Sequence, residues 1–162
     1  MESFVLDVSA CMPWCCEDEA TPSSEQTLVW AIAGANLHVP SLWPWEIMNA
    51  VAVAIRRGRI PAQRASQFFE QVSAFNIWMS PAPAVHDFAR LSLLASRLRL
   101  TAYDAAYLDL AQQLGLPLAT LDEELKRAAV LEGVEVVTGD PVSPSPAPPS
   151  PPPPPAPPPA VS

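Results

Sequence analysis

Short apolar runs alternate with longer helical patterns along most of this chain. The runs occupy residues 4–6, 36–39, 77–79, 116–119 and 134–137. Continuous apolar strands separated by helices are typical of a parallel sheet covered on both faces, whereas half-exposed strands would alternate apolar and polar residues. The sequence therefore predicts an α/β fold with a short central parallel sheet of about five strands.

The segments between these runs have helical spacing and the residues that begin and end helices. We expect helices at roughly 24–34, 44–58, 61–75, 85–98, 101–115 and 122–131. Several start near Pro, Ser or Thr, and glycine follows the last turn at Gly58 and Gly115. In the first helix, Ser23 or Ser24 is expected to cap the N-terminus, with these residues facing the core: Leu28, Val29, Ile32 and Ala33.

Proline is distributed unevenly and divides the chain. Of 21 prolines, 13 lie between Pro141 and Pro159, and residues 141–162 carry no charge, no glycine and no aromatic ring. Such a composition cannot build a core, and it predicts a disordered or polyproline II tail. Residues 1–140 hold every charged side chain and have the size of one ordinary domain. A second domain is excluded.

Membrane insertion and export are not expected. No apolar run reaches the roughly 18–20 residues of a membrane-spanning helix, and the N-terminus lacks the basic segment of a signal peptide. Three clustered cysteines make a poor disulfide framework and lack zinc-site spacing, so half-buried free thiols in a reducing cytoplasm are expected. They are Cys11, Cys15 and Cys16.

Four acids occupy positions that a parallel sheet brings together. Asp7 ends the first strand, Glu46 and Asp104 lie in the first turns of helices, and Asp122 follows the fourth strand. Working residues of open parallel sheets gather outside the carboxyl ends of the strands. Carboxylates packed together repel unless a cation neutralises them, and oxygen ligands suit Mg²⁺ or Mn²⁺. Such a site can activate water for displacement at a phosphodiester.

Each acid also has an ordinary structural interpretation. Asp104 completes a capping box with Thr101, and Glu46 and Asp122 are first-turn acids that the helix dipole favours. Asp7 gains nothing as a cap, so the metal-site hypothesis depends on the joint placement. Asp109, five residues after Asp104, projects from another helical face and is expected to be solvated.

Four segments that carry these acids resemble a PIN domain of the bacterial VapC type, in family order and spacing. They are residues 4–10 (FVLDVSA), 39–50 (VPSLWPWEIMNA), 100–108 (LTAYDAAYL) and 117–122 (PLATLD). The resemblance covers residues 3–137 and implies a PIN-like three-layer α/β/α fold. It also implies an Mg²⁺- or Mn²⁺-dependent endoribonuclease, the toxin of a type II toxin–antitoxin pair, which dimerises and is neutralised by a small antitoxin.

The resemblance assigns roles to individual residues. Asp7, Glu46, Asp104 and Asp122 would form the catalytic, metal-binding site. Three polar residues are expected around them, where an ordinary capping or strand-end role competes with support of the carboxylates. They are Ser9, Asn49 and Thr120.

RNA binding has to be reconciled with a net charge of −8. RNA affinity ordinarily comes from basic side chains that neutralise phosphates. Eight of the nine basic residues are arginines, which suit bidentate phosphate contacts. The candidates for RNA contact are Arg56, Arg57, Arg59, Arg97 and Arg99.

Protein partners and other functions are also considered. Large rings such as Trp43, Trp45 and Trp78 are numerous, which predicts an apolar groove for a partner segment. Two alternatives to the toxin stay open: a PIN nuclease of RNA processing or quality control without a toxin role, and a non-catalytic RNA- or protein-binding module. Maintaining mutually repelling acids argues against the second alternative.

Overall fold

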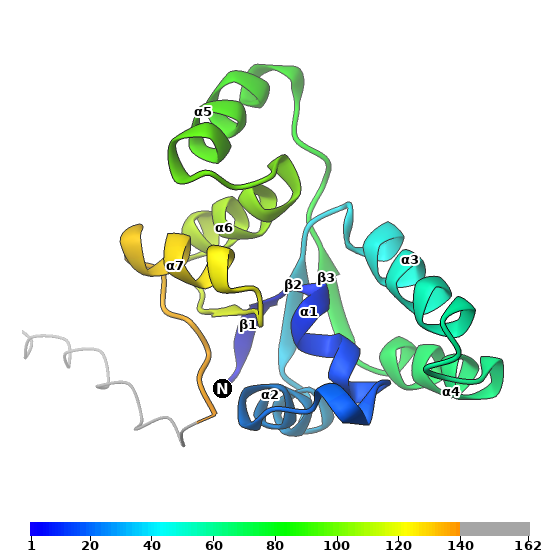
Figure 1. The fold of residues 1–162 in the computed structure, drawn as a ribbon. Coiled ribbons are helices and arrows are strands. Elements are labelled where there is room, and N and C mark those ends of the chain that lie inside the picture. The colour runs from blue at the N-terminus through cyan, green and yellow to red at the C-terminus, as the bar shows by residue number, and fades with distance from the viewer. Residues whose placement is uncertain (140–162) are drawn as a thin grey trace, which may run out of the picture.

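A four-stranded parallel sheet forms the centre of the computed structural model, which describes residues 1–139 (Figure 1). The strands lie in the order β3-β2-β1-β4. Every pair is parallel, and β1 and β2 occupy the middle. The strands are β1 (Ser3–Leu6), β2 (Asn36–Val39), β3 (Asn76–Met79) and β4 (Leu118–Ala119).

Helices make the connections between the strands, as the alternating pattern predicts. In Figure 1, α6 and α7 lie to one side of the strands and α3 and α4 to the other. The helices are α1 (Val8–Cys11), α2 (Pro22–Ile32), α3 (Trp43–Arg56), α4 (Ala62–Ser73), α5 (Phe88–Leu98), α6 (Ala102–Leu114) and α7 (Glu123–Leu131). Three single 3₁₀ turns complete the list: η1 (Met12–Trp14), η2 (Glu17–Glu19) and η3 (Val85–Asp87).

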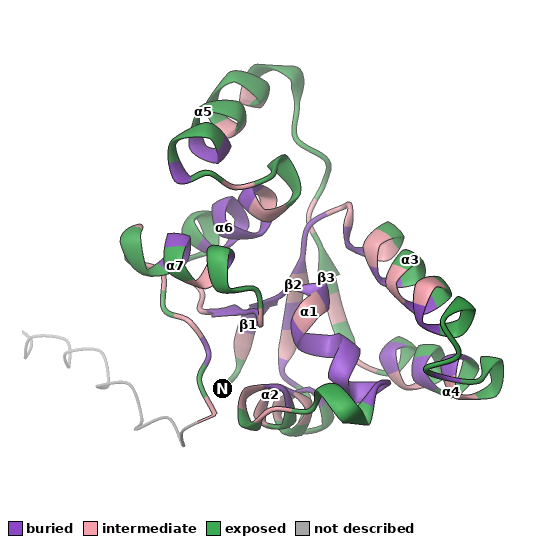
Figure 2. Ribbon diagram, in the orientation of Figure 1, coloured by how far each residue is buried: buried purple, intermediate pink, exposed green. Residues whose placement is uncertain are grey.

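The core surrounds β1, which lies inside the sheet between β2 and β4 (Figure 2). Phe4, Val5 and Leu6 have no exposed surface, because β1 has neighbours on both edges and α6 packs against it. Each such side chain stabilises the fold by about 1.5–3 kcal/mol relative to full exposure. This burial fixes the position of the next residue, Asp7.

The predicted fifth strand at 134–137 does not form in the described part of the chain. Val136 makes only an isolated parallel bridge with Leu118. The reason lies in β4, which contains two residues and therefore offers a neighbour little to pair with. The three-layer arrangement stays a prediction.

The first long helix differs from expectation in its cap and in its buried face. Thr21, rather than Ser23 or Ser24, caps α2, and Ser24 completes a capping box with it. Val29 and Ile32 are exposed, whereas Thr27 is fully buried with its hydroxyl donating to the Ser24 carbonyl. Ala33 is also exposed, whereas Leu28 packs partly buried against the core, so apolar periodicity identified one of the four predicted residues. The fully buried face consists of the small residues Ser24, Thr27 and Ala31.

Two further expectations concern the chain as a whole. The boundary at residue 140 and the tail at 141–162 fall outside the described residues, so the division into domain and tail stays a prediction. Within residues 1–139, no helix has the length and apolar character needed to cross a membrane.

Candidate active site

Asp7 and Thr120 meet because β1 and β4 are adjacent parallel strands that end at the same edge. Asp7 directly follows β1 and Thr120 directly follows β4, and the Asp7 N–H donates to the Ala119 carbonyl at 3.0 Å. Oδ2 of Asp7 accepts hydrogen bonds from the hydroxyls of Ser9 at 2.5 Å and Thr120 at 2.6 Å. Two of the three polar residues predicted beside the acids therefore contact Asp7.

These hydroxyls belong to a network that joins the two strand ends. Ser9 Oγ accepts the Leu121 N–H at 2.8 Å, and Thr120 Oγ1 accepts the Asp122 N–H at 3.1 Å. Asp7 is only 8% exposed, and this burial raises the pKa of its carboxyl, while the Ser9 and Thr120 hydrogen bonds oppose the shift. The network holds one carboxylate oxygen in a fixed direction.

Glu46 lies in the first turn of α3 and is half-buried. Its Oε2 accepts a short hydrogen bond from the Tyr107 hydroxyl on α6. Burial raises the pKa of Glu46, the Tyr107 hydrogen bond opposes the shift, and the charges of Asp7 and Asp104 raise it further. Glu46 therefore lies within the electrostatic influence of two other predicted acids, Asp7 and Asp104.

Tyr107 is a site residue that the sequence reasoning missed. It is 1% exposed and lies one turn after Asp104 on α6. Burial and the Glu46 hydrogen bond hold the pKa of its phenol far above the usual range, so the group remains a donor. One signal was present in the sequence: a tyrosine on a buried helical face needs a partner for its hydroxyl.

Asp104 and Asp122 begin helices, as their ordinary interpretation requires. Asp104 Oδ2 accepts from the Thr101 hydroxyl at 2.7 Å, in a capping box at the start of α6. Asp122 is the N-cap of α7, where its Oδ1 accepts the Leu125 N–H at 2.8 Å. Each contact uses one carboxylate oxygen, so capping and ligation are compatible.

The donor set suits a hard divalent cation, although the ligands are not preassembled. Within residues 1–139, no three acidic, His or Cys side chains are gathered closely enough to hold a metal ion. The four acids supply oxygen only, and the mutual repulsion that acts on Glu46 is the kind that a cation relieves. The composition of the site fits Mg²⁺ or Mn²⁺, and its closure around an ion requires side-chain movement.

Comparison with known proteins identifies the family. Residues 4–131 match the family model described as "PIN domain". The chain belongs to the PIN-domain family. It is 31% identical over 126 residues to Ribonuclease VapC3 of Pyrobaculum aerophilum, covering 75% of this chain and 91% of that protein. The crystal structure of PAE2754 from the same organism matches with a TM-score of 0.59 and 26% identity, covering 78% of this chain and 84% of that one. The expected resemblance to VapC-type PIN ribonucleases is thereby confirmed.

The remaining residues predicted to support the site or bind RNA differ in their contacts. Asn49 is exposed and makes no hydrogen bond with Glu46 among residues 1–139. Arg59 pairs with Asp18 and Glu19 at 2.7 and 2.6 Å. Arg97 pairs with Glu132 at 2.7 Å. These two arginines are therefore occupied by carboxylates in the described structure.

The remaining candidate arginines differ in their distance from the acids. Arg56 ends α3 ten residues after Glu46, so about 15 Å of helix separates them along the axis. Arg99 is exposed and adopts a left-handed conformation with φ 59°, between α5 and the helix that begins with Thr101 and Asp104. Among the five predicted arginines, Arg99 is the one next to a helix start that carries a site acid.

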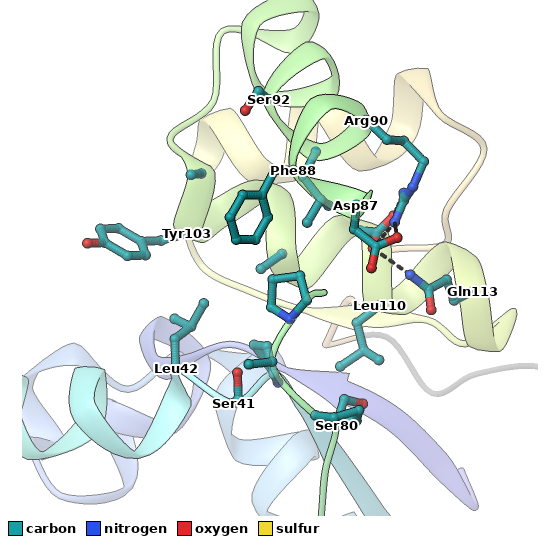
Figure 3. Close-up of a pocket in the computed structure, with 18 of the residues that line it drawn as sticks. Ser41, Leu42, Ser80, Asp87, Phe88, Arg90, Ser92, Tyr103, Leu110 and Gln113 are labelled. Carbon is teal, nitrogen blue, oxygen red and sulfur yellow. Dashed lines mark hydrogen bonds and ion pairs between the residues drawn. The ribbon is translucent and has the colours of Figure 1, made fainter. Parts of the chain in front are cut away.

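A hollow in this PIN domain is lined by residues other than the four acids (Figure 3). It has a volume of about 550 Å³ and lies between α5, α6 and the loops after β2 and β3. Tyr103 and Phe88 contribute rings, and none of the four acids lines it. At one side, Arg90 pairs with Asp109, which also accepts from Gln113 at 2.5 Å. Asp109 is therefore buried and ion-paired, not solvated as expected.

Proposed function

We propose that this chain is a divalent-metal-dependent endoribonuclease that hydrolyses RNA phosphodiester bonds and acts as the toxin of a type II toxin–antitoxin pair. The main support is that the charges of Asp7 and Asp104 both act on the half-buried Glu46 of a PIN domain and raise the pKa of its carboxyl. Such acids reduce the stability of a fold unless a ligand neutralises them, so their convergence favours a catalytic role.

The metal-binding residues in this proposal are Asp7, Glu46, Asp104 and Asp122. A bound Mg²⁺ or Mn²⁺ would activate water and neutralise charge that develops on the phosphate. The chain's own contribution is orientation. Ser9 and Thr120 hold Asp7, Tyr107 holds Glu46 and Thr101 holds Asp104, each through a hydrogen bond to one carboxylate oxygen.

For RNA, the proposal places the nearest phosphate contact at Arg99. Its guanidinium has no ion-pair partner among residues 1–139, and it precedes the α6 helix start by two residues. A left-handed conformation is costly for a residue other than glycine, which favours a functional reason for arginine here. Arg56 and Arg57 would contact a strand that extends away from the acids.

Two protein partners are proposed to bind this chain: a small antitoxin and a second copy of the chain. The support is exposed apolar surface. Trp45 is 75% exposed and Trp78 is 60% exposed, and Phe88 lies beside the hollow under α5. Aromatic residues are enriched at protein interaction surfaces relative to the rest of the surface. The toxin would act in the cytoplasm, where its RNA substrates are.

The deciding experiment compares wild type with Asp104→Asn in cleavage of RNA with Mn²⁺. The amide keeps the oxygen that Thr101 contacts, so the helix cap is preserved while a ligand charge is lost. We expect cleavage to fall by roughly 100-fold or more, the scale for removing one charge-stabilising group from an active site. Glu123→Gln is the matched control, because Glu123 is an exposed first-turn acid of α7 paired with Lys126.

Equal cleavage by wild type and Asp104→Asn would contradict the assignment of this site. Induction in a bacterial host then separates the toxin from the first alternative. Growth arrest by wild type but not by Asp104→Asn supports the toxin, whereas metal-dependent cleavage without arrest supports a PIN nuclease of RNA processing. Absence of cleavage by wild type, with RNA still bound, would support the non-catalytic module.

A further inference from the structure

The four acids of the site share one arrangement: a protein donor holds one oxygen of each carboxylate. Hydroxyl groups hold Asp7, Glu46 and Asp104, and a backbone N–H holds Asp122. Within residues 1–139, these donors bond to Oδ2 of Asp7, Oε2 of Glu46, Oδ2 of Asp104 and Oδ1 of Asp122. The opposite oxygen of each carboxylate receives no side-chain hydrogen bond there. Each acid therefore has one oxygen that no side chain engages among these residues.

Glu46 differs from the others because its only side-chain donor in the described part of the chain is distant in the sequence. Thr101 and Leu125 lie three residues from their acids, and Asp7 has a local donor, Ser9, in addition to the distant Thr120. Tyr107 is 61 residues from Glu46 and on another helix. A phenol has a single proton to donate, and Tyr107 gives it to Glu46 from a side chain that is 1% exposed. Its packing fixes where that proton points.

We propose that Tyr107 is a positioning residue that holds Oε2 of Glu46 and so presents Oε1 alone to the metal, which favours Mg²⁺ and Mn²⁺ over Ca²⁺. This inference rests on the proposed metal-dependent function. Mg²⁺ requires near-octahedral geometry and binds through one or two carboxylates together with waters, whereas Ca²⁺ takes more ligands and often binds a carboxylate through both oxygens. Binding through both oxygens would compete with the hydrogen bond from Tyr107, so this bond favours the first mode for Glu46.

A purely structural role for Tyr107 predicts a different result. If the ring only fills the core, phenylalanine would fill the same space and metal binding would not change. Tyr103 provides the matched control, because it lies one turn earlier on α6, is 62% exposed, and makes no hydrogen bond with an acid among residues 1–139. Comparing Tyr107→Phe with Tyr103→Phe isolates the hydroxyl that contacts Glu46.

The test measures Kd for Mn²⁺ and for Ca²⁺ by titration calorimetry on the full chain, together with Tm. For Tyr107→Phe we expect Mn²⁺ affinity to fall by about 10–100-fold, the usual effect of removing a partner of a metal ligand. Ca²⁺ affinity should stay level or rise, because Glu46 is released to bind through both oxygens. Tyr103→Phe should leave both affinities unchanged.

If Tyr107→Phe binds Mn²⁺ as tightly as wild type does, and likewise Ca²⁺, the inference is overturned while the metal site itself stands. Absence of Mn²⁺ binding by wild type would overturn the proposed metal site and this inference with it.

If Tyr107→Phe has a markedly lower Tm, Glu46→Asp provides the second test. It withdraws the carboxylate from the phenol while the ring still fills the core, and its ratio of Mn²⁺ to Ca²⁺ affinity should fall too. An unchanged ratio would contradict the role of the hydrogen bond.

Discussion

Burial keeps the three cysteine thiols in their protonated form. Cys11, Cys15 and Cys16 are free and at most 2% exposed. Desolvation raises the pKa of all three, and that of Cys15 to about 11, because the charged thiolate is disfavoured away from water. The thiols were expected to be free and half-buried; they are free and fully buried.

At the residue scale, this burial predicts an alkaline loss of stability. Cys15 binds its proton more tightly in the folded state than in the unfolded chain, so its contribution is complete below the ordinary pKa of 9.0 and is lost as the pH rises toward 11. The free energy of unfolding, measured in urea at pH 8 and pH 10.5, should fall by on the order of 1–3 kcal/mol.

Cys15→Ala is the control, and its stability should depend less on pH over the same interval. The folded wild type should also react with iodoacetamide at pH 8 far more slowly than the protein in urea, because the thiolate is the reactive form. Rapid labelling of the folded protein, or a flat profile of stability up to pH 10.5, would contradict this account of the thiols.

The same residue scale shows what the sequence could reveal about the site. Asp7 stands out in the sequence because a charge directly after an apolar run is unusual at a buried strand end. Tyr107 does not stand out, because a tyrosine flanked by alanine and leucine is expected to be an ordinary core residue. Its role becomes visible only with its distant partner, Glu46. Asp109 was misjudged for the same reason: its burial depends on Arg90, which lies on another helix.

At the element scale, two helices begin with the same capping arrangement. Thr21 with Ser24 caps α2, and Thr101 with Asp104 caps α6, each by a reciprocal hydrogen-bond pair three residues apart. The difference lies in what the third residue does afterwards. Ser24 is buried beneath α2, whereas Asp104 is a proposed metal ligand.

This pair predicts a separation of stability from activity. Thr21→Ala and Thr101→Ala should each lower the free energy of unfolding by about 1 kcal/mol, the typical cost of losing an N-cap side chain. Only Thr101→Ala should also reduce RNA cleavage, by about 10-fold or more, because it frees the Asp104 carboxylate. Equal activity of the two variants in Mn²⁺ would show that the cap does not orient the acid.

Elements differ in how well the sequence predicts them. The apolar runs that became β1 and β2 were clear because both strands are buried on both edges. The run at 134–137 is similarly apolar, but its neighbour β4 has only two residues, so an isolated bridge forms instead of a strand. The length of β4 cannot be predicted from the run itself. In α2, the buried stripe is small and polar, so side-chain apolarity could not identify it.

At the scale of the whole molecule, every proposed catalytic contact lies within residues 1–139. The four acids and their donors fall inside the match to the PIN domain, residues 4–131, and the core extends to Val137. A chain shortened to residues 1–140 should therefore keep its metal-dependent cleavage of RNA within about 2-fold of the full chain, since no side chain that shapes the site is removed.

The measurement is the initial rate of RNA cleavage at saturating Mn²⁺, with circular dichroism to establish that both chains are folded. Loss of activity by the shortened chain with its folding intact would assign a role to the proline-rich segment. Asp104→Asn in the shortened chain is the control, because it should abolish whatever activity remains.

The pairing of β1 with β4 has a consequence for the timing of synthesis. Asp7 is made before Thr120, which holds its carboxylate and lies 113 positions later. A nascent chain that carries Asp7, Glu46 and Asp104 still lacks the neighbour that orients the first of them. The site is therefore completed only after Thr120 has been made, and a product interrupted before this residue would release no organised nuclease into the cell that makes it.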